Sequence, residues 1–234
     1  MDRTKRRGEL EMGMGVGEAG YRERIARRAA QELRTGMIVN LGIGIPTLVA
    51  DYIPADVKVV FHAENGILGS GPRPERGAEN PMLCNAGGFP VTLLPGASCF
   101  DSVTAFAIIR QGLLDVTILG ALEVSQTGDI ANWIVPGKRV PGMGGAMELA
   151  QKAKQVMVLT THLDKNGRSK IVRECRLPLT AKGAASLIIT DMAVLEVRQD
   201  GLYLREVMEP YSLADVIAVT EAELKTDGEV AIFH

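Results

Sequence analysis

The sequence predicts an α/β protein with an open, mostly parallel sheet, covering helices and a C-terminal β-hairpin. Short apolar runs at 37–41, 57–61, 115–119 and 155–160 have the composition of strands buried on both faces. Helical patterns at 25–33 and 102–110 alternate with them, which implies a parallel sheet. The hairpin is predicted from Asp200-Gly201, a turn pair that lies between strand-like runs at 193–198 and 202–207.

Length and composition predict one large domain. The chain has 234 residues, of which 46% are hydrophobic and 23% charged, as in an ordinary globular protein. Residues 1–20 are rich in glycine and charge without a hydrophobic period, so we interpret them as a mobile leader. The domain is therefore expected at 21–234.

Charge and hydropathy give no reason to expect nucleic acid or a membrane as a partner. Lys and Arg total 26 against 28 for Asp and Glu, so nothing favours nucleic acid or an anionic membrane. No stretch reaches the length of a membrane helix, and the amino terminus lacks the apolar core of a secretory signal. We expect a cytoplasmic protein whose partners are small-molecule substrates and another subunit.

Cysteine and histidine usage gives no metal site. The odd number and wide spacing of the cysteines favour core thiols in a reducing compartment over a disulfide framework or a zinc site. The histidines have no metal-ligand spacing, and His62 is expected to be a core or supporting residue. These residues are Cys84, Cys99, Cys175, His62, His162 and His234.

The first helix is expected to pack through apolar residues at helical spacing between arginines. Gly36 follows at a position suited to the helix terminus, and the arginines are expected to form a solvated face. The apolar positions are Ile25, Ala26, Ala29, Ala30 and Leu33.

A glycine loop follows the strand at 37–41. Gly42, Ile43 and Gly44 precede a helix expected to begin near Pro46 and Thr47. Backbone amides of such a loop can hold a phosphate or a pantetheine amide. The loop lacks the spacing of a dinucleotide fingerprint and the Lys-Ser/Thr of a P-loop, so a plain structural turn explains it equally well.

Glu64 is a carboxylate in otherwise apolar or glycine-rich surroundings. It follows the strand at 57–61, and Asn65-Gly66 supplies a tight turn that can present it at the edge where α/β sheets bind ligands. Asn-Gly is also a hairpin signal, and a Glu beside such a turn is commonly just solvated.

A second candidate cradle lies in the glycine-rich connection 128–150. Gly144 and Gly145 precede a helical segment, and their amides could point at one oxygen, as in an oxyanion hole. Trp133 in the same connection is expected to pack in the core. Near the C-terminus, 212–220 has the pattern of a capped helix.

Five segments in order resemble the B (β) subunit of family I coenzyme A transferases, the 3-oxoacid type that acts on succinyl-CoA and acetoacetate. They are NLGIGIPTLV at 40–49, ENGILG at 64–69, LPGASCFDS at 94–102, LGALEVSQTGDIANWIVPGK at 119–138 and GMGGAMEL at 142–149. The family usually has Ser before the Glu-Asn-Gly, where this chain has Ala63, which can alter the hydrogen bonding of the carboxylate.

The resemblance implies a site and a mechanism. Glu64 would attack an acyl-CoA and pass through a glutamyl-CoA thioester, with Gly145 as oxyanion donor and Gly144 beside it. The coenzyme A contacts would be Gly42, Ile43, Gly44, Asn65 and Gly66. No permanently bound cofactor or metal is implied, because acyl-CoA is a substrate.

The resemblance also implies a partner, the A subunit, in an α2β2 assembly without which the chain would be inactive. The acceptor would be a short carboxylic or 3-oxo acid such as acetoacetate, and the sequence does not distinguish the donors. Two alternatives stay open: a sugar-phosphate isomerase or effector-sensing domain of the same broad superfamily, and a non-catalytic interface subunit.

Overall fold

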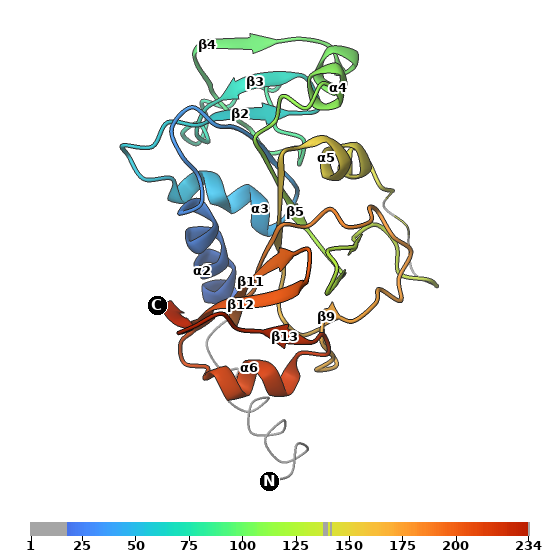
Figure 1. Ribbon diagram of the computed structural model, residues 1–234. Coiled ribbons are helices and arrows are strands. Elements are labelled where there is room, and N and C mark those ends of the chain that lie inside the picture. The colour runs from blue at the N-terminus through green and yellow to red at the C-terminus, as the bar shows by residue number, and fades with distance from the viewer. Residues whose placement is uncertain (1–17, 138–139, 141, 234) are drawn as a thin grey trace.

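A large mixed sheet runs through the molecule (Figure 1). The computed structural model describes residues 18–137, 140 and 142–233, and within them ten strands lie in the order β13-β12-β11-β10-β8-β5-β1-β2-β3-β4, with β14 pairing β12. Their bounds are β1 Ile38–Leu41, β2 Val60–Ala63, β3 Ile67–Ser70, β4 Leu93–Cys99, β5 Val116–Gly120, β8 Gln155–Leu159, β10 Leu187–Ile189, β11 Ala193–Arg198, β12 Gly201–Met208, β13 Leu224–Lys225 and β14 Ala231–Phe233.

The mostly parallel character of the sheet is confirmed at its centre. The neighbours β10-β8-β5-β1-β2 are all paired in parallel, while β2-β3-β4 and β10-β11-β12 are antiparallel. The hairpin at Asp200-Gly201 is also confirmed, because β11 and β12 pair antiparallel around it. The hairpin belongs to the main sheet, because its strand β11 pairs with β10.

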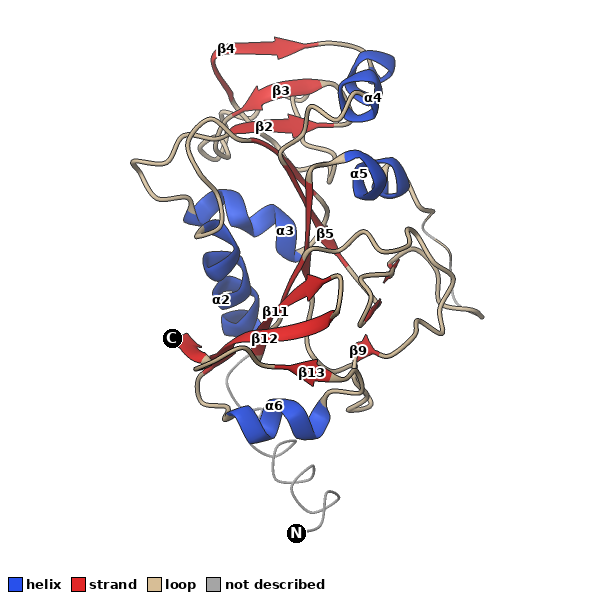
Figure 2. Cartoon of the chain, viewed as in Figure 1, coloured by secondary structure: helices blue, strands red, loops and turns tan. Residues whose placement is uncertain are grey.

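Two hydrophobic layers cover opposite faces of the sheet (Figure 2). On β8, Val156 and Val158 pack into one cluster while Met157 and Leu159 pack into the other, as strand alternation requires. The Met157 side is covered by α2 (Glu18–Ala30), α3 (Ile45–Leu48) and the 3-10 helix η1 (Val49–Tyr52). The other side is covered by α4 (Ser102–Arg110), α5 (Ala146–Lys152) and α6 (Leu213–Val219).

A second, three-stranded sheet shares the α5 side. It consists of β6 (Glu123–Ser125), β7 (Ile130–Ala131) and β9 (Ile171–Val172) in the order β7-β6-β9. No sequence pattern indicated this sheet, because strands of two or three residues are too short to show alternation. Trp133, which follows β7, is half-buried, and its indole Nε1 donates to the Leu179 carbonyl at 3.3 Å.

Helix α2 differs from the expected first helix at both ends. It begins at Glu18, so residues 18–20 of the expected leader are helical, while 1–17 lie outside the described residues. It ends at Ala30, and the next three amides bond carbonyls three residues earlier in a tighter turn. Gly36 therefore does not terminate the helix; with φ +90° it belongs to a later turn, where its amide donates to the Lys58 carbonyl.

Arg28 corrects the expectation of a solvated arginine face. Its side chain is buried, and Nε and Nη2 donate to the two Glu206 oxygens at 2.7 and 2.6 Å. Nη1 lies 2.7 Å from Glu32. A bidentate pair of this kind is strong and directional, so it fixes α2 against β12. Arg27 also has a structural contact, 4.7 Å above the Tyr52 ring.

Two helices agree closely with the sequence interpretation. Helix α4 covers the expected range, and the Asp101 side chain caps it by accepting the Thr104 amide at 2.7 Å. Helix α6 has Ser212 as its N-cap in a full capping box with Asp215. Local side-chain chemistry therefore determines where these two helices start.

We expect acid to destabilise the fold through His162. Its ring is fully buried between hydroxyls, with Nδ1 3.0 Å from Thr190 Oγ1 and Nε2 2.8 Å from Thr220 Oγ1. Burial lowers the pKa of His162 from 6.5 to about 4. Between these values the unfolded chain binds more protons, so the free energy of unfolding falls as pH drops, by about 2 kcal/mol at pH 5.

Urea denaturation at pH 7 and pH 5 measures this effect. The control is His162→Gln, whose amide can still meet both hydroxyls but does not titrate. The variant should lose about 2 kcal/mol less than the unmodified chain on acidification. An equal loss in both proteins would assign the acid sensitivity to other groups.

Candidate active site

Glu64 lies in the turn between β2 and β3, at the carboxyl end of a strand that pairs in parallel with β1. Asn65-Gly66 thus forms a hairpin turn, and this turn places Glu64 at the carboxyl edge of the parallel strands. The Gly66 amide closes the turn onto the Ala63 carbonyl at 2.9 Å, and Gly66 has φ +114°. Glu64 is neither fully buried nor fully exposed.

Two buried polar residues hold the Glu64 carboxylate. Asn40 of β1 donates from Nδ2 to Glu64 Oε2 at 3.0 Å and contacts the His62 carbonyl at 3.2 Å. Thr117 of β5 donates to Asn40 Oδ1 at 3.3 Å, which fixes the orientation of the amide. Asn40 and Thr117 are both completely buried, so three adjacent parallel strands position one carboxylate.

His62 is buried next to this network. Alternation along β2 places it on the same side of the sheet as Glu64, and its side chain is 2% exposed. Burial lowers the pKa of His62, against the opposing effects of the Ala105 carbonyl and the Glu64 charge. A neutral imidazole at this position agrees with a supporting rather than a catalytic role.

The backbone of Gly145, directly before α5, lies close to Glu64. A Cβ built on Gly145 would lie 3.6 Å from Glu64 Cγ and 3.1 Å from Phe106 Cζ. No described residue accepts a hydrogen bond from the amide of Gly144 or Gly145. The backbone of Gly145 therefore lies beside the Glu64 side chain, and its amide has no acceptor among the described residues.

Helix α4 supports this glycine segment. The Phe106 ring packs against Gly145, and Arg110 lies 5.6 Å from the centre of that ring. Arg110 also pairs with Glu148 of α5 at 2.8 Å. These contacts join α4 to α5 and hold the start of α5 near Glu64.

The loop after β1 is only partly available to a ligand. The Gly42 amide donates to the Ile118 carbonyl at 2.8 Å, so it extends the sheet pairing. No described residue accepts from the amides of Ile43 or Gly44, and the Ile43 side chain is 67% exposed. The Gly42 part of the expected cradle is thus structural, while Ile43 and Gly44 face outward.

Asn65 has a structural contact of its own. Its side chain donates to the Cys84 carbonyl at 2.8 Å, which ties the Glu64 turn to the segment 80–90. Gly66 is buried. Both residues shape the turn, and their predicted contact with coenzyme A stays a prediction.

Residues 22–220 match the family model described as Coenzyme A transferase. The chain belongs to the coenzyme A transferase family. The β chain of a probable coenzyme A transferase from Bacillus subtilis (strain 168) is 57% identical over 216 residues, covering 92% of this chain and 98% of that protein. The chain is accordingly a CoA-transferase subunit of the B, or β, type.

Two further relatives carry different substrate names. The B component of the succinyl-CoA:3-ketoacid coenzyme A transferase from Helicobacter pylori (strain ATCC 700392 / 26695) is 50% identical over 204 residues, covering 87% of this chain and 98% of that one. The β chain of the acetate CoA-transferase from Escherichia coli (strain K12) is 46% identical over 209 residues, covering 89% and 95%. Similarity at this level does not separate their substrates.

The fold of this CoA-transferase subunit is shared with solved structures. The apoenzyme of an acyl-CoA transferase from Escherichia coli O157:H7 superposes with a TM-score of 0.73 at 23% identity, covering 91% of this chain and 43% of that chain. At this identity the match shows the fold alone. No helix among the described residues is long and apolar enough to cross a membrane.

Sequence reasoning missed the residues that position the carboxylate. Asn40 lies in the otherwise apolar run MIVNL, and Thr117 lies between valine and isoleucine. A polar residue inside a strand buried on both faces needs a hydrogen-bond partner, and this was the available signal. Phe106 gave no such signal, because it has the appearance of any apolar helix residue.

Proposed function

We propose that the chain transfers coenzyme A between an acyl-CoA and a short carboxylic or 3-oxo acid such as acetoacetate, through a glutamyl-CoA thioester on Glu64. The observation that carries the proposal is the proximity of Glu64 to the backbone of Gly145, whose amide has no acceptor among the described residues. A carboxylate nucleophile beside backbone donors suits acyl transfer, in which each step passes through an oxyanion.

The chemistry proceeds in balanced steps. A Glu64 oxygen attacks the thioester carbonyl, the carbon–sulfur bond breaks, and coenzyme A leaves as its thiolate while a mixed anhydride remains. The thiolate then attacks the Glu64 carbonyl, which releases the donor's carboxylate and forms the glutamyl-CoA thioester. The acceptor carboxylate reverses these steps. Nucleophiles and leaving groups are anions throughout, so no general base is required.

Asn40 and Gly145 would have separate roles in this sequence. The Asn40 amide donor orients the carboxylate before attack and is held in place by Thr117. The Gly145 amide, with Gly144 adjacent, would stabilise the negative oxygen as each tetrahedral intermediate forms. Ile43 and Gly44 would contact coenzyme A through their outward-facing backbone.

We expect Gly145→Ala to lower kcat by about tenfold or more, because misplacing reacting groups by a fraction of an ångström is costly. The new methyl would lie 3.1 Å from Phe106 Cζ, so either the ring or the Gly145 backbone must shift, while its 3.6 Å approach to Glu64 Cγ is an ordinary contact that fills the space beside the carboxylate. Gly144→Ala is the matched control, since its methyl meets nothing within 4 Å, although φ is +55°. Equal losses of kcat in both variants would argue against a special role for Gly145.

Mass spectrometry of the intact complex tests the thioester. The chain with its A subunit is incubated with acetoacetyl-CoA, treated with borohydride and mapped by peptides. A coenzyme A adduct on the peptide containing Glu64, discharged by borohydride to a reduced side chain, is the expected result. Binding of acyl-CoA without any adduct would instead favour a phosphate-binding or scaffold role.

The assembly is part of the proposal. We infer that the A subunit completes the site in an α2β2 complex in the cytoplasm, and that the chain alone is inactive. The relatives, which are named as the B or β members of their enzymes, support a partner subunit. Succinyl-CoA, acetyl-CoA and butyryl-CoA are the donors to compare, because pocket shape and A-subunit residues would set the choice.

A further inference from the structure

The His62 ring is buried without a hydrogen bond of good geometry to any residue that the structure describes. Its side chain is 2% exposed, and both ring nitrogens are buried and unpartnered. Arg24, Arg28 and Glu148 also bury one unpartnered atom, but each bonds through another atom of the same side chain. Buried polar groups normally have partners, so the His62 ring calls for an explanation.

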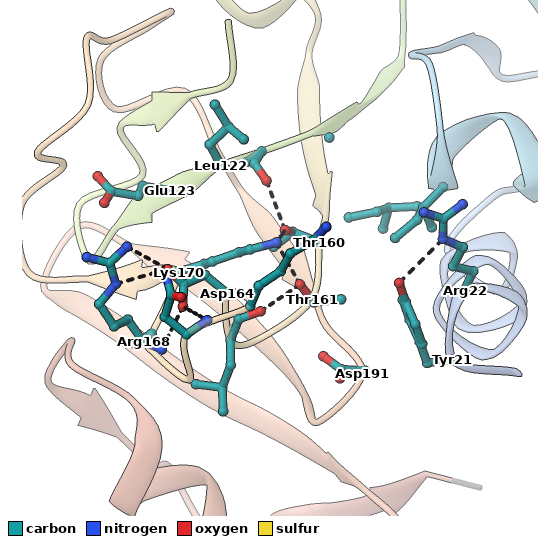
Figure 3. Close-up of a pocket in the computed structure, with 18 of the residues that line it drawn as sticks. Tyr21, Arg22, Leu122, Glu123, Thr160, Thr161, Asp164, Arg168, Lys170 and Asp191 are labelled. Atoms are coloured by element: carbon teal, nitrogen blue, oxygen red, sulfur yellow. Dashed lines mark hydrogen bonds and ion pairs between the residues drawn. The ribbon is translucent and has the colours of Figure 1, made fainter. Parts of the chain in front are cut away.

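A large cavity elsewhere in the subunit shows how buried charges are held in this fold (Figure 3). It has a volume of about 1160 Å³ and lies between the start of α2 and the carboxyl ends of β5 and β8. Lys170 Nζ lies there 2.6 Å from Thr161 Oγ1. Burial lowers the pKa of Lys170, and the charges of Asp191 and Asp164 oppose this effect. Glu64 does not line the cavity, so the unpartnered histidine ring belongs to a different part of the fold.

His62 lies beside the nucleophile proposed above. It precedes Glu64 by two residues and is paired with Asn40 in the register of β1 and β2. Strand alternation places the ring on the same side of the sheet as the Glu64 side chain. Burial lowers the pKa of His62 and the Glu64 charge opposes this, so the two groups are close enough to interact.

The Glu64 carboxylate has one oxygen that is held and one that is not. Asn40 Nδ2 donates to Glu64 Oε2 at 3.0 Å and to the His62 carbonyl at 3.2 Å. An amide nitrogen carries only two hydrogens, so Asn40 has no donor left for the second oxygen. Glu64 Oε1 accepts a hydrogen bond from no described residue. A second donor would fix the plane of the carboxylate, which a single bond leaves free to turn.

A neutral imidazole has one N–H, and two acceptors compete for that of His62. The Ala105 carbonyl of α4 favours a higher pKa of the ring but makes no hydrogen bond of good geometry with it. This carbonyl lies inside a helix, where the amide four residues later already bonds it. A carboxylate is the stronger acceptor, because its hydrogen bond is charge-assisted. Glu64 is therefore the better partner for the ring.

We propose that His62 is a positioning residue, which donates its N–H to Glu64 Oε1 when the A subunit and acyl-CoA complete the site. The inference rests on the proposed function, because it gives His62 a task only if Glu64 is the nucleophile. Hydrogen bonds between catalytic groups are often long in a free enzyme and shorten in the complex with substrate. Asn40 and His62 together fix the carboxylate, and Oε1 keeps a second lone pair for the attack.

Kinetics of the complex with its A subunit tests this role. His62→Leu removes the donor at a similar volume, and kcat should fall about tenfold or more, because a hydrogen bond to a charged group is lost. KM for acetoacetyl-CoA should change little, since the ring is buried. His62→Gln keeps an N–H donor and should restore most of kcat. The rate at which the coenzyme A adduct appears on Glu64 should follow kcat in each variant.

Urea denaturation of the chain separates positioning from a structural role. The His62 ring has no well-formed bond to lose, so His62→Leu should leave the urea midpoint unchanged or raise it. The matched control is His162→Leu, at a buried histidine whose two ring nitrogens bond Thr190 and Thr220. Its urea midpoint should fall, because both buried hydroxyls lose a partner.

Three results would overturn the inference. An unchanged kcat in His62→Leu would show that Glu64 needs no second donor. Equal losses of kcat in His62→Leu and His62→Gln would show that the ring acts through its shape. A fall in the urea midpoint of His62→Leu as large as that of His162→Leu would make the ring a structural element.

The unmodified complex keeps the two proposals apart. If the coenzyme A adduct still forms there on Glu64, any of these three results removes the role of His62 and leaves the proposed function intact. Absence of the adduct from the unmodified complex would remove the proposed function and this inference with it.

Discussion

Replacing Glu64 by Gln should abolish coenzyme A transfer in the complex with the A subunit. Gln keeps the size of the side chain and can still accept the Asn40 hydrogen bond through its carbonyl oxygen. It cannot form the anhydride, so kcat should fall by about ten-thousand-fold or more, as when other enzymes lose their nucleophile. The coenzyme A adduct on this peptide should disappear with the activity.

Two further variants make the Glu64 result specific. Glu64→Asp keeps the carboxylate but withdraws it by one methylene from Asn40 and Gly145, and we expect a loss of about a hundredfold. Glu75→Gln, at an exposed glutamate of the following loop, should be fully active. Full activity of Glu64→Gln would show that this chain only completes an interface.

The sequence predicts the parts of this fold whose signals are local. The bounds of α4 and α6 follow from Asp101 and Ser212, because caps act within one turn of helix. The central strands follow from apolar runs such as VTILG of β5, which is buried on both faces. Glu64 was found in the same way, as a carboxylate in apolar surroundings beside an Asn-Gly turn.

The features that the sequence did not predict depend on contacts between segments that are far apart in the chain. Arg28 lies in a run of arginines like any exposed helix face, and only the approach of β12 turns it into a buried partner of Glu206. The link from Thr117 through Asn40 to Glu64 needs the pairing of β5, β1 and β2, which no local pattern specifies. The cavity at Lys170 likewise forms only when α2 meets the ends of β5 and β8.

Gly66→Ala should damage the fold and the activity together, since this glycine shapes the turn that carries Glu64. A methyl group built at Gly66 would lie 2.0 Å from the Phe100 carbonyl oxygen, and φ is +114°. The obstacle is backbone that is itself paired to Gly66, because the Phe100 amide donates to the Gly66 carbonyl at 2.9 Å. The free energy of unfolding should fall by about 3 kcal/mol or more.

Gly77→Ala separates the clash at Gly66 from backbone strain. Gly77 has φ +90° in an exposed loop, and an added methyl group there meets no atom within 4 Å. Gly77→Ala should lower the free energy of unfolding by the backbone strain alone, about 1 kcal/mol. Its transfer activity should be normal. If urea denaturation gave both variants the same stability, the Phe100 contact would be irrelevant; if Gly66→Ala were folded but inactive, the turn would serve mainly to aim Glu64 at Gly145.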